Sequence, residues 1–348
     1  MTLSLSLSAD VITSLYLKQG HNNNLFADSY GISDFYNTIG GEVALYPSSF
    51  AQITINGDYN VYYTNTDLSN FNGGASFTLI PTSDSSKLSL ILSGSAGKRN
   101  FGELYNIYNN NSLNGDLYLI YKFSNRLSFK TSGYYSYVGY DNADEVTDEY
   151  FGFSAGLNLT FLKNNSLDFE TFIYQKKYNS DLIDLSGNSS QTYDFIDYKV
   201  RYSRPLGERW GTSLNYTFHN LKSYDAYTIS GYTIDYLSPW NSLWNGHSAS
   251  LSLKHYLKNQ SILELSAGYT DKEYVSSFDY TDIDNNFVES FQRNDQVTQI
   301  DLKYYKSFYL ENSMITPVLS VGYTQNSSSL ALYDYNSFNI ALASTFSF

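Results

Sequence analysis

The chain has 348 residues, a formal net charge of −13, 18% aromatic residues and no cysteine. The length suits two or three soluble domains or one large barrel, and the absence of cysteine excludes disulfides and thiolate metal sites. The acidic balance argues against a nucleic-acid partner, because phosphates are bound by lysine and arginine.

The first segment, residues 2–18, alternates apolar and polar side chains along its whole length. Leucine, alanine and valine fill most odd positions, and serine and other polar residues fill most even ones. A period of two places alternate side chains on opposite faces of a β-strand, whereas an amphipathic helix needs spacings of three and four. A tilted strand crosses a bilayer with about 9–11 residues. We therefore expect a transmembrane strand whose odd positions face lipid.

The same alternation returns in fifteen further segments, and no apolar run approaches the about 18 residues of a membrane helix. In chain order the sixteen segments cover about 2–18, 34–46, 50–64, 71–80, 88–96, 113–123, 127–137, 151–161, 167–173, 196–202, 210–218, 249–253, 263–269, 300–304, 315–323 and 338–348. This pattern predicts an all-β fold, a closed antiparallel transmembrane barrel of about 16 strands, as one domain over residues 1–348.

The connections between these segments alternate between short turns and longer loops. The longer loops cover about 98–112, 141–149, 179–191, 220–245 and 274–293, among others. Outer-membrane barrels have an even strand number, short periplasmic turns and longer extracellular loops. The alternation therefore places both termini on the periplasmic side. Inward glycines, such as Gly40, Gly152, Gly156 and Gly268, are expected to let the wall bend or to make room for large neighbours.

The charged residues in the inner parts of the strands test this assignment, because the apolar residues alone define the expected lipid faces. All of them lie at the parity opposite to the lipid face, and a lysine or arginine facing lipid at the midplane costs about 2–4 kcal/mol. The predicted pore-lining residues are Asp10, Glu42, Asp58, Asp116, Lys122, Lys130, Asp168, Glu170, Lys176, Asp197, Lys199, Arg201, Lys254, Glu264, Asp301 and Lys303. A water-soluble barrel with its apolar face inward would need a very large interior.

The chain ends in Ala343-Ser344-Thr345-Phe346-Ser347-Phe348, an alternating strand with a terminal aromatic residue. This ending resembles the terminal signal of the bacterial outer-membrane β-barrel superfamily. The resemblance implies an outer membrane, surrounding lipid and recognition by the barrel-insertion machinery. In size the chain resembles porins and also the barrel ends of polysaccharide exporters. The resemblance to porins implies that a homo-oligomer is possible. No signal peptide precedes the first strand, so a removed leader and a longer parent chain both stay open.

The chain contains four histidines, which are candidates for catalysis. Barrel phospholipases use a serine–histidine pair on the outer face, but Ser248 and Ser250 have the parity opposite to that of His247, and position 249 is alanine. No histidine lies beside the acidic loop residues in sequence, as a barrel protease would require. We therefore expect no catalytic residues, no enzyme activity, no metal site and no cofactor.

The longest loop is rich in aromatic residues and is a candidate for constricting the lumen. The candidate residues are Tyr224, Tyr227, Tyr232, Tyr236, Trp240 and Trp244. The alternative is an extracellular cap packed on itself.

These features together favour a porin-like channel for passive diffusion of small hydrophilic solutes. A barrel of 16–18 strands leaves an aqueous channel, and the nine predicted pore-lining acids slightly exceed the seven bases, which predicts a weak preference for cations or neutral solutes. Two alternatives stay open: the barrel domain of a longer exporter of polysaccharide or protein, and a barrel that displays its loops for adhesion or assembly.

Overall fold

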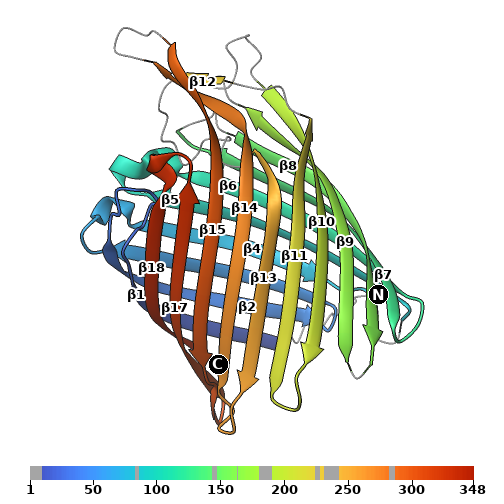
Figure 1. The fold of residues 1–348 in the computed structure, drawn as a ribbon. Helices are drawn as coiled ribbons and strands as arrows, with labels where there is room; N and C mark the ends of the chain where they lie inside the picture. Colours follow the sequence, from blue (N-terminus) through green and yellow to red (C-terminus); the bar gives the residue numbers. More distant parts are fainter. Residues whose placement is uncertain are drawn as a thin grey trace, which may run out of the picture.

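The alternating segments fold into one closed barrel (Figure 1). The computed structural model describes residues 10–82, 86–142, 147–162, 164–179, 190–223, 228–230, 243–281 and 287–348. Within these ranges sixteen long strands form the wall, each antiparallel to its neighbours. The first, β1 (Asp10–Asn22), pairs with both β2 (Asp34–Ser48) and β18 (Tyr335–Ser347), which closes the sheet. The predicted fold is confirmed.

The other thirteen strands of the wall follow in chain order. They are β3 (Ala51–Tyr62), β4 (Asn70–Leu79), β5 (Leu88–Phe101), β6 (Asn110–Lys122), β7 (Leu127–Tyr140), β8 (Thr147–Phe161), β9 (Asn165–Asn179), β10 (Ser190–Pro205), β11 (Trp210–Ser223), β13 (Trp244–Tyr256), β14 (Ile262–Thr281), β15 (Phe287–Tyr305) and β17 (Ser313–Ser328).

Five short elements complete the described chain. The strand β16 (Phe308–Leu310) continues the pairing of β15 with β17, and β12 (Thr228–Ser230) pairs in parallel with the outer part of β14. Three 3₁₀ turns lie in the loops: η1 (Thr66–Leu68), η2 (Glu103–Tyr108) and η5 (Ala331–Tyr333). None of the helices in the described part of the chain has the length and hydropathy to cross a membrane.

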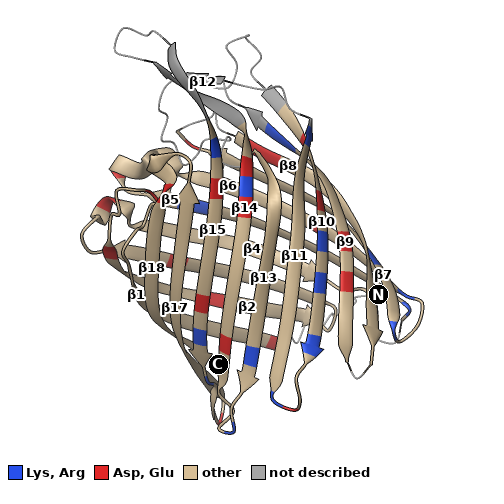
Figure 2. Ribbon diagram, in the orientation of Figure 1, with Lys and Arg blue, Asp and Glu red and all other residues tan. Residues whose placement is uncertain are grey.

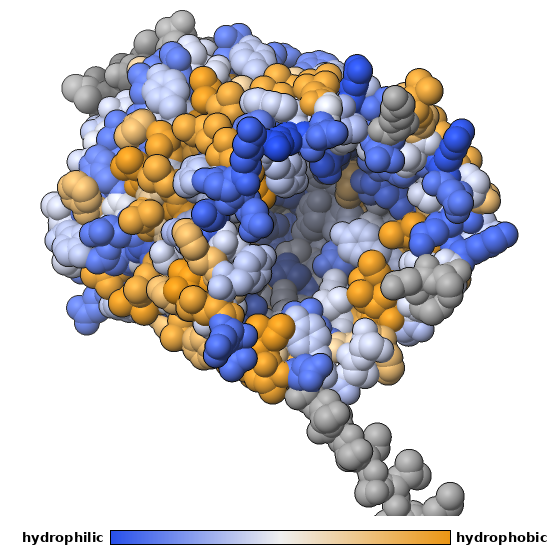
Figure 3. Space-filling model, turned by 90° about the horizontal axis from the view of Figure 1, so that it is seen from below, coloured by the Kyte–Doolittle hydropathy of each residue, from blue (hydrophilic) through white to orange (hydrophobic). Residues whose placement is uncertain are grey.

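Burial in this wall is the reverse of that in a soluble protein. Large apolar side chains at the predicted lipid-facing positions are exposed, for example Leu15 at 51%, Ile39 at 59% and Phe151 at 62%. Polar side chains of the opposite parity are buried, such as Ser132 at 4% and Ser154 at 1%. Rows of apolar side chains therefore cover the outside of the barrel. Figure 3 shows apolar patches on the outer surface around a central hollow bordered by hydrophilic residues.

The short and long connections lie at opposite ends of the barrel, with the C-terminus at the end of the short ones (Figure 1). The alternation in length is less strict than the sequence suggests. The connection 80–87 lies at the end of the short turns yet is longer than the connection 282–286 at the other end.

The five longer predicted loops given above are all partly strand, and two of them to a large extent. The range 274–293 was expected to be a long loop, but β14 and β15 extend through most of it, with paired residues out to Thr281 and Phe287. In the range 98–112, β5 continues to Phe101 and β6 already begins at Asn110. Polar residues interrupt the apolar rows in both ranges, which hid the strands, because backbone pairing beyond the apolar belt needs no apolar face.

Candidate functional site

The predicted pore-lining residues all lie in strands, on the face opposite to the exposed apolar rows. Asp10 is in β1, Glu42 in β2, Asp58 in β3, Asp116 and Lys122 in β6, Lys130 in β7, Asp168, Glu170 and Lys176 in β9, Asp197, Lys199 and Arg201 in β10, Lys254 in β13, Glu264 in β14, and Asp301 and Lys303 in β15. Figure 2 shows several of the charges along β10, β14 and β15, whereas β17 and β18 have none.

A polar network joins β7, β8 and β9. The Lys130 ammonium lies 3.0 Å from a Glu170 carboxylate oxygen and 3.7 Å from one of Asp168. The Ser154 hydroxyl donates to Glu170 at 2.8 Å. Gly156 stands directly between Lys130 and Glu170 in the register, so the lysine reaches across β8 over a residue without a side chain. The structure thus brings three predicted residues together.

Other predicted residues have different partners. Lys254 pairs with Glu264 at 3.4 Å, and the Lys199 ammonium lies 3.9 Å from the centre of the Phe172 ring, a cation–π contact. Lys176 lies 5.7 Å from the Tyr150 ring. Asp301 accepts from the Gln299 amide at 2.8 Å. Among the described residues, ten predicted residues form no ion pair: Asp10, Glu42, Asp58, Asp116, Lys122, Lys176, Lys199, Arg201, Asp301 and Lys303.

A second polar network crosses β1 to β5. The Tyr16 ring covers Gly40, where an added Cβ would lie 2.3 Å from the ring, and its hydroxyl is hydrogen-bonded to Asp58. Asp58 accepts from the Asn72 amide at 2.8 Å, and the Arg99 Nε donates to the same amide's oxygen at 2.6 Å. The expected role of inward glycines is confirmed at Gly40, as it is at Gly152 and Gly156.

Gly268 differs from the other three glycines. An added Cβ there would meet only the Ser250 and Ala249 atoms, at ordinary distances of 3.7 and 3.8 Å. No large neighbour uses the space at Gly268, so of the two expected roles only the bending of the wall stays open for this glycine.

Seven inward charged residues were not among the predicted ones: Lys18, Asp34, Arg99, Asp148, Lys272, Arg293 and Asp295. Lys18 and Arg99 have the inward parity of β1 and β5, so the alternation itself could have found them. Arg293 lay in the range expected to be a loop, and Asp295 lay just beyond it. With these additions, the inward acids and bases are more nearly balanced than the nine-to-seven count.

Arg293 holds the loop between β17 and β18 against the wall. Its guanidinium pairs with Asp295 at 2.5 Å and is nearly fully buried. The same group lies 4.2 Å from the centre of the Tyr274 ring and 3.4 Å from that of Tyr333 in η5. Burial raises the pKa of the Tyr333 hydroxyl more than the adjacent Arg293 lowers it, so this phenol stays neutral.

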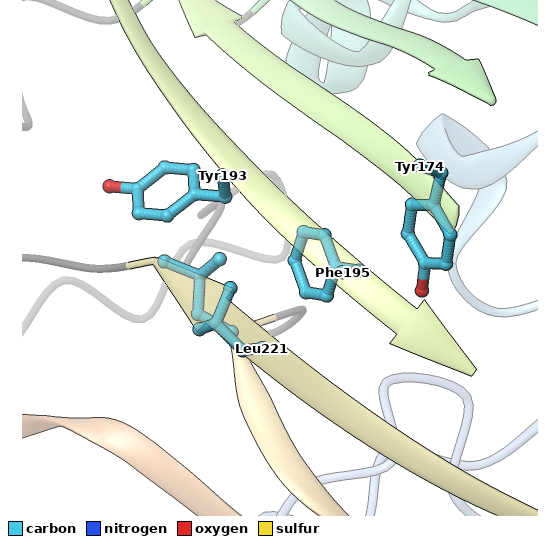
Figure 4. Close-up of a cluster of buried hydrophobic side chains, with 5 residues drawn as sticks. Tyr174, Tyr193, Phe195 and Leu221 are labelled. Carbon is cyan, nitrogen blue, oxygen red and sulfur yellow. The ribbon is translucent and has the colours of Figure 1, made fainter. Parts of the chain in front are cut away.

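A hydrophobic cluster fills part of the inward face near the loop end of β9, β10, β11 and β13 (Figure 4). Its buried members are Tyr174, Tyr193, Phe195, Leu221 and Leu243. Figure 4 shows Phe195 between Tyr174 on one side and Tyr193 and Leu221 on the other. Phe195 stacks on Tyr174 with ring centres 4.9 Å apart. The inward face is therefore not uniformly polar: it has a buried aromatic region near the loops.

His219 joins this cluster to the charged residues. Its Nδ1 lies 2.6 Å from an Asp197 carboxylate oxygen, and its ring lies 4.1 Å from that of Trp244. The Tyr174 hydroxyl approaches the same Nδ1 at 3.4 Å. The hydrogen bond to the imidazole thus offsets the free-energy cost of burying the Asp197 carboxylate. Asp197 is an anchor for the aromatic region rather than an isolated charge.

Of the candidate constriction residues, only Trp244 can be placed. It is the first residue of β13, beside His219 and 5.3 Å from the Lys272 ammonium. Five others lie outside the described residues: Tyr224, Tyr227, Tyr232, Tyr236 and Trp240.

The arrangement around His247 follows the parity argument. The Tyr216 hydroxyl lies 2.6 Å from His247 Nδ1, whereas the Ser248 hydroxyl bonds to Thr270 at 2.9 Å on the other face of β13. The described residues contain no group of three or more histidine, cysteine or acidic side chains placed to hold a metal ion.

Comparison with known proteins places this barrel among solved outer-membrane structures. A bacterial polysaccharide outer membrane secretin aligns with a TM-score of 0.52 at 10% identity, covering 97% of each chain. OpdK of Pseudomonas aeruginosa, solved with vanillate, aligns with a TM-score of 0.50 at 11% identity, covering 97% of this chain and 99% of that one. CdiB from Acinetobacter baumannii aligns with a TM-score of 0.51 at 12% identity, covering 97% of this chain and 60% of that one. No family model and no curated protein sequence matches. At these identities the likeness establishes the fold of outer-membrane β-barrels.

Proposed function

We propose that residues 1–348 form a single barrel domain that acts as a water-filled channel in a bacterial outer membrane and passes small hydrophilic solutes by diffusion. One observation carries this proposal: a closed wall with exposed apolar rows outside and charged, hydrogen-bonded rows inside, around a hollow (Figure 3). Sixteen strands give a barrel wide enough for water to remain inside.

Solute selection in this proposal comes from the inward charges and the loops. The inward acids and bases are close to balance, and several are paired within the wall. The chain as a whole has a net charge of −13. A negative field at the mouths raises the local concentration of cations. We therefore propose weak preference for cations or neutral solutes over anions.

The orientation follows from the two ends of the barrel. Short turns face the periplasm in outer-membrane barrels, so we place the short connections and both termini there. The terminal strand β18 then presents its last aromatic residues to the barrel-insertion machinery. We also propose that the aromatic loop between β11 and β13 narrows the lumen from the extracellular side; Leu221 near the end of β11 and Leu243 just before β13 are both buried in the inward cluster.

Planar-bilayer recordings test the channel directly. The purified chain, refolded into lipid, is expected to give stepwise currents. In a gradient of potassium chloride, the sign of the reversal potential is expected to show a weak preference for potassium over chloride. Heat-denatured chain serves as the control. Absence of current would overturn the channel, and a preference for chloride would overturn the selectivity.

Export is the second candidate function. Its support is the likeness in fold to the polysaccharide secretin and to CdiB, of which this chain covers 60%. The gene sequence upstream of Met1 separates the two: a signal peptide favours the free channel, and a further domain favours an exporter. A barrel that only displays its loops would pass almost no current in the same recordings.

A further inference from the structure

A polar recess of about 400 Å³ lies in the wall formed by β3, β4, β5 and β6. Ligand sites in proteins span about 300–1,000 Å³, so the recess has room for a small solute. The inward residues that line it occupy three successive rows of the sheet register. It is separate from the aromatic cluster, which lies on β9 to β13.

The upper edge of the recess is a hydrogen-bonded row of three side chains, Asp58, Asn72 and Arg99. They stand opposite one another in the register of β3, β4 and β5. Asn72 accepts from the Arg99 Nε and donates to the carboxylate, so both charged groups are held in fixed positions. The terminal guanidinium nitrogens of Arg99 form no hydrogen bond with a described residue, so their N–H groups are available to a solute.

The floor of the recess is the next row, in which Asn56, Gly74, Gly97 and Ser112 stand opposite one another. The two glycines in the middle remove the side chains that would fill the space. The Asn56 amide forms no hydrogen bond with a described side chain, so its donor and acceptor are available. The lower edge is formed by Ser76 and Ser95, also opposite each other.

The chemistry of this lining selects for hydroxyl groups without net charge. One carboxylate and one guanidinium balance each other, and the Lys98 ammonium at the rim is paired with Asp141 at 3.2 Å. Amides and hydroxyls both donate and accept, as do the hydroxyls of a polyol. A multiply charged ion would gain little from such a balanced set, because each of its contacts with one charge would be opposed by the other.

We propose that this recess, on β3 to β6, is a binding subsite for neutral polyhydroxylated solutes of mono- to disaccharide size on their way through the channel. The inference rests on the proposed channel function. The Arg99 guanidinium and the Asn56 amide donate to solute hydroxyls, the Asp58 carboxylate accepts from them, and the glycine floor lets the solute ring approach the wall.

Ion current through single channels in the presence of sucrose tests the subsite. The unmodified protein is expected to show transient sucrose-dependent interruptions. Two variants are expected to weaken the apparent sucrose affinity about tenfold or more. A factor of this size corresponds to the loss of one hydrogen bond to a charged group. Ser76→Leu fills the lower edge, and Arg99→Gln removes the guanidinium donors while keeping a polar side chain.

The matched control is Ser252→Leu, an inward serine on β13, which narrows the lumen equally on a different wall. It is expected to keep the sucrose response. Loss of the response in all three variants, an unchanged response in both recess variants, or stronger block by gluconate than by sucrose would each overturn the subsite. Ion current without any sucrose effect would overturn the subsite and leave the channel standing, whereas absence of current would overturn the channel itself.

Discussion

The smallest residue in the β7–β9 network determines its geometry. Lys130 and Glu170 lie on strands that are not neighbours, and they meet because Gly156 stands between them on β8. A Cβ at position 156 would lie 2.5 Å from the Phe169 carbonyl oxygen and 3.1 Å from the Lys130 side chain. The pair therefore depends on a residue that has neither charge nor side chain.

Replacing this glycine is expected to weaken the barrel. Gly156→Ala should lower the free energy of unfolding by about 1–3 kcal/mol, the usual cost of overpacking a filled site. Urea unfolding of the protein in lipid vesicles, followed by tryptophan fluorescence, measures this.

Gly115→Ala is the matched control, because nothing lies within 4 Å of a Cβ added there. It should leave the stability unchanged or raise it by about 0.4–1 kcal/mol through the unfolded chain. Equal effects at both positions would contradict the role given to Gly156.

At the scale of elements, a single carboxylate fixes a loop to the wall. Asp34, the first residue of β2, accepts hydrogen bonds from the backbone N–H groups of Tyr63, Thr64 and Asn65, at 2.7–3.2 Å. The Asn65 side chain donates to it as well, at 3.0 Å. Asp34 is 2% exposed. The loop between β3 and β4 therefore has a defined position relative to β2.

Removing the charge of Asp34 should release this loop from the wall without unfolding the barrel. Asp34→Asn replaces one acceptor oxygen by an NH₂ group, which cannot accept from the backbone, so about 1–3 kcal/mol of local stabilisation is expected to be lost. Limited proteolysis should then cut within residues 63–69 at least several-fold faster. Asp67→Asn, an exposed acid in η1 of the same loop, should leave the cleavage rate unchanged; faster cleavage of this control would show that any loss of charge in the loop suffices.

The elements also show where sequence reasoning ends. Alternation identified every wall strand. Each strand has to keep its apolar and polar side chains on opposite faces, because a shift by one position would move a side chain to the wrong face. Alternation did not identify the outer parts of β14 and β15, where both faces meet water and no alternation is required. Alternation also predicted the face on which Lys130 lies, but not its partners. Partners on other strands depend on how the strands are aligned with one another, and the pattern within one strand does not contain this register.

At the scale of the whole molecule, the pairing of the first and last strands closes the sixteen strands into one continuous wall. The seam between β1 and β18 has nine paired positions, from Ser14 with Ser347 to Asn22 with Asn339. Among the sixteen wall strands of the described chain, closure leaves no edge strand with unpaired backbone groups, which a bilayer would not tolerate. Closure was expected from the resemblance of the chain to outer-membrane β-barrel proteins. The polar recess was not predicted, because it needs three rows of side chains from four strands in register.

Two neighbouring positions on β13 test the assignment of the two faces. Leu251 is 44% exposed in the middle of the strand, and Ser252 points into the barrel. Leu251→Arg is expected to lower the free energy of unfolding in lipid vesicles by about 2–4 kcal/mol, since it places a charge in hydrocarbon near the midplane. Ser252→Arg adds the same side chain to the water-filled side and should cost well under half as much. If the two variants were equally destabilised, or if the order were reversed, the apolar rows would not face lipid and the channel interior would lose its physical basis.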